Sequence, residues 1–186
     1  MKINHKISDF ISNENSLKKI YYKVLSEEIL NNYTTPSNFL SVCWDRYKKF
    51  NIKRNVNNNE PGKVFEEIFG ILLILEGYEI FSKDKEIDGV PLVKPDIMLK
   101  SNSDQFIFIS LKTSLRERWK QADWESIRFK HVYPDTKCYL ITLNETEKKS
   151  LKKKIDNNLL VGGLDDVFFG LSEELNSFFE LIRHIK

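Results

Sequence analysis

The sequence has few of the features that mark several large protein classes. It contains only two cysteines, Cys43 and Cys138, each in an apolar stretch, so we expect two free buried thiols and no disulfide framework. No window approaches the roughly 20 apolar residues of a membrane span, and the N-terminus lacks the apolar core of a signal peptide. We therefore expect a soluble, cytoplasmic protein with no membrane partner.

The sequence also has little net charge. It has 29 Lys and Arg against 27 Asp and Glu, which gives a formal net charge of +2. If DNA is the partner, basic side chains must gather on one surface while acidic side chains lie elsewhere. The three histidines are scattered, and Gly162 and Gly163 are not followed by the residues of a phosphate-binding loop. A histidine-based triad and a P-loop are thus not indicated.

The periodicity of apolar residues predicts an α/β fold. The expected helices cover 15–32, 36–50, 62–77, 117–131, 148–158 and 171–185, and the expected strands cover 78–81, 95–100, 105–112, 136–143 and 159–163. This order fits a mixed central sheet flanked by helices. The polar, Asn-rich stretch 51–62 predicts a connection, so we divide the chain into a small helical N-terminal part, 1–58, and a main domain, 59–186.

Two charged residues stand at the ends of neighbouring predicted strands. Asp96 follows Pro95 and opens one strand, and Lys112 ends the next, with a turn at 101–104 between them. A hairpin would bring both side chains to the same end of the sheet. A carboxylate there can bind a hard cation such as Mg²⁺, and a lysine can orient a water or stabilise charge at phosphorus. Together they indicate the chemistry of phosphodiester hydrolysis.

Several short motifs resemble the PD-(D/E)XK nuclease core. These are PD at 95–96, SLK at 110–112, KTSLRERWKQ at 112–121 and GKVFEE at 62–67. They are most similar to the rearranged core of the EcoRII/NgoMIV-like branch of type II restriction endonucleases. There a small residue, here Ser110, replaces the acid before the lysine, and a glutamate of the following helix takes its place. The offset from Lys112 to Glu125 equals the offset in that branch.

The resemblance covers about 60–183 and implies a restriction-endonuclease-like core with four catalytic residues. It implies Asp96 and Glu125 as ligands of Mg²⁺, and Lys112 as the catalytic lysine. It also implies Glu66, rather than Glu67, as an outer or second-metal acid. Asp123 is the rival to Glu125, with a surface carboxylate as its ordinary role.

Residues for DNA reading follow from the same resemblance. Arg116, Glu117 and Arg118 match an Arg-acid-Arg triplet that reads C:G pairs, and arginine suits guanine O6 and N7 while glutamate accepts from cytosine N4. The alternative is a charged helix face. Further candidates for DNA contact are Lys120, Trp44 and Arg46, the last two as a stacking site for a flipped base, although a core position is the more common role for a tryptophan such as Trp44.

The resemblance implies a Mg²⁺-dependent type II restriction endonuclease that cuts double-stranded DNA at a short palindromic site containing CC and GG. Such an enzyme is expected to act as a homodimer, with a cognate cytosine methyltransferase encoded nearby. Two alternatives stay open: another PD-(D/E)XK nuclease that repairs, nicks or needs a partner subunit, and a non-catalytic DNA-binding module with the same fold. The stretch before the core is shorter than in stand-alone members of the branch.

Overall fold

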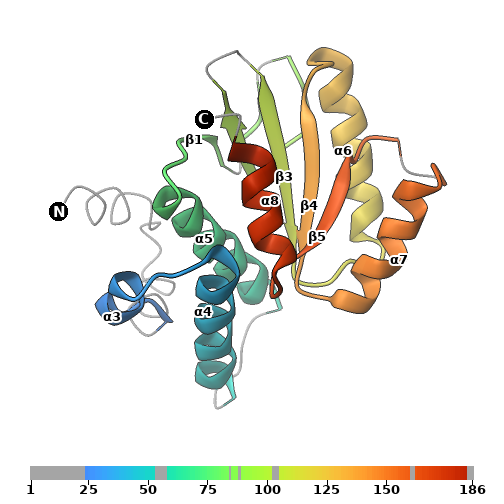
Figure 1. Cartoon of the computed structure of the whole chain (residues 1–186). Helices are drawn as coiled ribbons and strands as arrows, with labels where there is room; N and C mark the ends of the chain where they lie inside the picture. Colours follow the sequence, from blue (N-terminus) through green and yellow to red (C-terminus); the bar gives the residue numbers. More distant parts are fainter. Residues whose placement is uncertain are drawn as a thin grey trace.

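The computed structural model describes residues 24–52, 58–83, 85–87, 89–101, 105–159 and 162–183. In these residues a mixed five-stranded sheet lies between two layers of helices (Figure 1). The expected α/β class with a mixed central sheet is confirmed.

The strands follow one another across the sheet in chain order. They are β1 Ile80–Ser82, β2 Ile97–Lys100, β3 Phe106–Lys112, β4 Lys137–Thr142 and β5 Asp166–Phe169. The first three strands pair antiparallel, and β3, β4 and β5 pair parallel. The expected β2–β3 hairpin is therefore present, although 102–104 of its turn lie outside the described residues.

Helices cover both faces of the sheet. They are α3 Glu27–Asn31, α4 Pro36–Asn51, α5 Glu60–Leu75, α6 Arg118–Val132, α7 Glu145–Asp156 and α8 Glu174–Ile182. Side chains alternate along β3, so that Ile107 and Ile109 pack with α4, α5 and α8, whereas Phe108 packs with α6 on the other face. Figure 1 shows the same division, with α5 and α8 on one side of the sheet and α6 and α7 on the other.

The larger core layer is rich in aromatic rings. Phe69 of α5 lies 6.2 Å from Phe178 and 6.0 Å from Phe179 of α8, measured between ring centroids. Trp44 of α4 packs edge-on against Phe65 of α5, with centroids 6.1 Å apart. Helix α4 thus shares one core with the sheet domain. The boundary between 1–58 and 59–186 stays a prediction.

The expected helix over 15–32 differs from the structure. Its first part, 15–23, lies outside the described residues, and the described part is interrupted at Leu25 and Ser26 before α3 begins. Ser26 is extended, with φ −95° and ψ 155°, and its hydroxyl accepts from Arg46 Nη1 at 2.9 Å. Apolar spacing does not reveal this contact, because Arg46 lies 20 residues further along the chain.

The expected strand at 159–163 is wrong for the residues described there. Leu159 is exposed, and Gly162 and Gly163 form bends, while 160–161 lie outside the described residues. The last strand is β5, which begins at Asp166. The sequence did not indicate this strand because two acidic residues stand at its start. Their charges are compensated by Lys130 and Lys152, which are distant in the sequence.

The two cysteines and the apolar helices bear on the expectations drawn from composition. Cys43 and Cys138 are free and buried, as expected, and burial raises the pKa of each thiol to about 12. Within the described ranges, no helix combines the length and apolar character that crossing a membrane requires.

Candidate active site

The β2–β3 hairpin brings Asp96 and Lys112 into direct contact. Ile97 pairs with Ile109, so continuing this register by one residue sets Asp96 opposite Ser110. One carboxylate oxygen, Asp96 Oδ2, accepts from Lys112 Nζ at 2.6 Å, from the Leu111 amide at 2.6 Å and from the Ser110 hydroxyl at 3.2 Å. The Lys112 and Asp96 side chains are 15% and 14% exposed, so the pair is largely desolvated.

Glu125 reaches the same cluster from α6. It is buried, and its Oε1 accepts from the Gln121 amide group at 2.8 Å, one helical turn earlier. Burial raises the pKa of Glu125. The Gln121 hydrogen bond and the charge of Lys112 oppose this rise in pKa, and the charge of Asp96 adds to it. These charge effects indicate that Glu125 lies near Asp96 and Lys112, so that three of the four expected catalytic residues are close to one another at one end of the sheet.

Asp123 has a different environment from Glu125. Its Oδ1 accepts from the amides of Gly163 at 2.7 Å and Leu164 at 3.0 Å, and Gly162 donates to both of its oxygens at 3.2 Å. A Cβ added at Gly163 would lie 2.3 Å from the Asp123 carbonyl oxygen, so only glycine fits there. Asp123 therefore anchors the segment before β5 to α6. Its carboxylate binds backbone amides of that segment, whereas the carboxylate of Glu125 binds Gln121.

The carboxylates at the sheet end suit Mg²⁺ as a donor set. Among the residues described, Asp96 Oδ1 and Glu125 Oε2 accept no hydrogen bond, so each carboxylate keeps one oxygen for a ligand. The described parts of the chain contain no group of three or more His, Cys, Asp or Glu arranged to hold a metal ion. Two carboxylates are nevertheless a common protein contribution to Mg²⁺, which keeps several waters and binds phosphates as well.

The two candidate glutamates of α5 differ in burial. Glu66 is half-buried, whereas Glu67 is buried and forms an ion pair with Lys83. Glu66 thus stays the candidate for an outer or second-metal acid, and Glu67 is engaged with a lysine next to β1.

The expected DNA-reading residues lie where β3 leads into α6. Arg116, Glu117 and Arg118 are exposed, and Arg118 is the first residue of the helix. Arg116 and Glu117 form a turn that precedes the helix, so the helix begins one residue later than the expected 117. Lys120 forms an exposed ion pair with Glu117, and this hydrogen-bonded lysine lowers the pKa of Glu117.

Trp44 and Arg46 are engaged within the protein. Trp44 is 9% exposed, and its ring centroid lies 5.0 Å from that of Tyr47. Its ring also contacts Phe65 of the core edge-on. Arg46 donates to Ser26 and lies 3.7 Å from the Glu28 carboxylate. For Trp44 this packing favours the core alternative over a stacking site for a flipped base.

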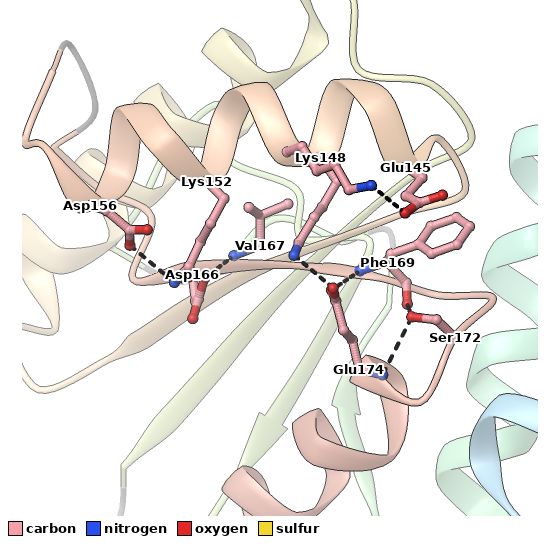
Figure 2. A network of polar contacts seen from close by, with 10 residues as sticks. Glu145, Lys148, Lys152, Asp156, Asp166, Val167, Phe169, Ser172 and Glu174 are labelled. Atoms are coloured by element: carbon pink, nitrogen blue, oxygen red, sulfur yellow. Dashed lines mark hydrogen bonds and ion pairs between the residues drawn. The ribbon is translucent and has the colours of Figure 1, made fainter.

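Three of the five lysines of α7, Lys148, Lys149 and Lys152, are held in ion pairs (Figure 2). Lys148 contacts Glu174 at 2.8 Å, and Lys152 contacts Asp166 at 2.8 Å. The same two carboxylates accept from the amides of Phe169 and Val167 on β5, the edge strand. Satisfied edge amides disfavour pairing with another strand.

The sequence interpretation missed Gln121 and the role of Ser110. Gln121 lies four residues before Glu125, so the i,i+4 rule for helices could have identified it once α6 was assigned. Ser110 lacks the charge of the acid that it replaces, but its hydroxyl helps to hold Asp96.

Comparisons with known proteins identify the fold. No protein-family model and no curated protein matches the chain. Among solved structures, the chain is similar to restriction endonuclease PspGI in complex with substrate DNA, at 18% identity and a TM-score of 0.56. The alignment covers 99% of this chain and 82% of that chain. The chain therefore has a restriction-endonuclease-like fold.

Proposed function

We propose that this chain is a Mg²⁺-dependent type II restriction endonuclease, which hydrolyses phosphodiester bonds of double-stranded DNA at a short palindromic site containing CC and GG. The observation that carries the proposal is the cluster of Asp96, Lys112 and Glu125 at one end of the sheet, in a fold shared with a restriction endonuclease. A non-catalytic module would have no need to keep a desolvated lysine in contact with one carboxylate and near a second.

Each member of the cluster has a role that its environment supports. Asp96 and Glu125 would hold the metal ion, with Glu66 as an outer or second-metal acid. A bound Mg²⁺ would supply positive charge to stabilise the transition state of phosphoryl transfer. Because burial disfavours the charged form of Glu125, a cation beside it would be bound more favourably than at an exposed carboxylate. Lys112, held by Asp96, would orient the attacking water or stabilise charge at the phosphate.

Base reading is assigned to the turn before α6. The guanidinium groups of Arg116 and Arg118 make no hydrogen bond or ion pair with any other described residue, and both side chains are exposed. They are thus available for bidentate contacts to guanine, with Glu117 accepting from cytosine. Lys120, in the first turn of α6, would contact the phosphate backbone.

A palindromic site requires two identical active sites, so we propose a homodimer whose twofold axis coincides with that of the DNA. A cytosine methyltransferase encoded nearby would protect the host sites. Trp44 is assigned to the core and not to the DNA surface, on the basis of its packing.

The test uses the purified chain and a long unmethylated DNA of known sequence, with Mg²⁺ or with EDTA, followed by sequencing of the ends. Discrete Mg²⁺-dependent fragments that share a CC- and GG-containing site would support the proposal. Nicks or random ends would replace it with a repair, nicking or partner-dependent nuclease. Tight binding without cutting would replace it with a non-catalytic DNA-binding module.

A further inference from the structure

The turn that carries the proposed reading residues is held by a side chain from a distant part of the sequence. Glu147 of α7 accepts hydrogen bonds from two consecutive backbone amides, Leu115 at 2.5 Å through Oε2 and Arg116 at 3.3 Å through Oε1. The turn is closed by a hydrogen bond from the Arg118 amide to the Leu115 carbonyl oxygen at 2.5 Å. One carboxylate thus holds the two peptide groups on either side of the Leu115 Cα atom.

The conformation at Arg116 is one that needs such support. Its φ is +35°, in the left-handed region that residues with a Cβ rarely adopt. Strained backbone of this kind persists only where its surroundings determine it, and it gathers at functional sites. Here the surroundings are Glu147 on one side and the buried side chain of Leu115 on the other, which packs with Trp119 and Leu151.

Glu147 is itself well fixed. It lies in the first turn of α7, where the partial positive charge of the helix end favours a carboxylate. Its amide donates to the side chain of Asn144, the N-cap residue, at 3.1 Å. The carboxylate therefore points from a capped helix end toward the turn before α6, and it makes its contacts with backbone only, leaving the Arg116 side chain free to face DNA.

We propose that Glu147 is a positioning residue that sets the fidelity of DNA reading, by holding the turn at 115–118 in the conformation from which Arg116, Glu117 and Arg118 address base edges. This inference rests on the proposed function. Recognition groups must be held to within about 0.5 Å of their productive geometry, and an arginine carried on a loosened turn loses its bidentate alignment with guanine. Loss of the Glu147 contacts should therefore reduce discrimination between sites more than it reduces the rate of cutting.

The test compares Glu147→Ala and Glu147→Gln with Glu145→Ala. Glu145 lies in the same first turn of α7, but it is exposed and pairs with Lys149. The first readout is the ratio of cleavage rates at the cognate site and at sites with one changed base pair. We expect this ratio to fall about 10- to 100-fold in Glu147→Ala, by less in Glu147→Gln, which keeps one acceptor, and not at all in Glu145→Ala.

Two further measurements separate positioning from a general loss of structure. In an Arg116→Ala background, Glu147→Ala should cost less discrimination than it does in the wild type, because part of its effect acts through the Arg116 side chain. Amide hydrogen exchange at Leu115 and Arg116 should accelerate at least about tenfold in Glu147→Ala and remain unchanged in Glu145→Ala.

The outcomes distinguish this inference from the proposed function. Site-specific cutting with unchanged discrimination in both Glu147 variants, or unchanged exchange at Leu115 and Arg116, would overturn the positioning role. If the wild-type chain cuts no DNA, the proposed function fails and the reading role fails with it. The exchange measurement then decides alone whether Glu147 holds the turn.

Discussion

Replacing Gly163 by alanine should destabilise the protein far more than the same change at its neighbour Gly162. A Cβ at Gly163 would lie 2.3 Å from the Asp123 carbonyl oxygen and 2.6 Å from the Ile127 amide nitrogen, both in the backbone of α6. A Cβ at Gly162 would lie 3.5 Å from the end of the Ile127 side chain, which is an ordinary contact. The two variants add the same methyl group to adjacent positions.

The magnitude follows from the hydrogen bonds that the methyl group would displace. Relieving the clash requires a movement of about 1 Å, which would lengthen the bonds from Gly163 and Leu164 to Asp123, now 2.7 and 3.0 Å, beyond a useful range. A hydrogen bond to a charged group contributes about 1.5–3 kcal/mol, so two lost bonds amount to roughly 3–6 kcal/mol. For a domain of this size that lowers Tm by roughly 6–24 °C.

The assay is urea and thermal unfolding of both variants beside the wild type. Gly162→Ala should stay within about 0.5 kcal/mol of the wild type, as an exposed substitution usually does. Equal stability of the two variants would refute the reasoning, because it would mean that the segment before β5 does not lie against α6 as described.

Other changes have expected outcomes that follow from burial. Because the pKa of Glu125 is raised in the folded state, its charge opposes folding above the folded pKa, and this penalty disappears as pH falls below the unfolded value. Glu125→Gln should therefore raise the urea midpoint at pH 8 without metal, with a gain that shrinks toward pH 4. Mg²⁺ should raise the Tm of the wild type and have little effect on Glu125→Gln. The thiols of Cys43 and Cys138, with pKa about 12, should resist thiol reagents at pH 8 until the protein is unfolded. Trp44→Ala should reduce the free energy of unfolding by about 3–5 kcal/mol in a urea titration, as expected for a core tryptophan.

Local signals were sufficient for the part of the site that lies within one hairpin. Asp96 and Lys112 are joined by a short turn between two strands with clear apolar patterns, so their contact follows from strand pairing. The position of Glu125 depended on a resemblance, since the sequence alone does not distinguish it from Asp123. That distinction comes from the amides of Gly162, Gly163 and Leu164, which are about 40 residues away from Asp123 in the chain.

Contacts between distant segments explain what the sequence did not predict. Strand β5 contains an acidic residue whose charge is compensated by Lys152 of α7, so the segment appears too polar for a strand when considered alone. The contacts of Glu147 with the turn at Leu115 and Arg116 span more than 30 residues, and no local pattern indicates them. The left-handed backbone at Arg116 could not be predicted either, because arginine has no preference for that conformation.

The most direct test of the central claim compares Lys112→Ala with Lys137→Ala in DNA cleavage with Mg²⁺. Lys137 begins β4 at the opposite end of the sheet and is half exposed, so its loss removes a lysine without altering the cluster. If Asp96, Lys112 and Glu125 form the active site, Lys112→Ala should lose at least about 100-fold in cleavage rate and keep DNA binding, while Lys137→Ala cuts normally. Equal cleavage by the two variants would contradict the assignment of this cluster as the site of hydrolysis.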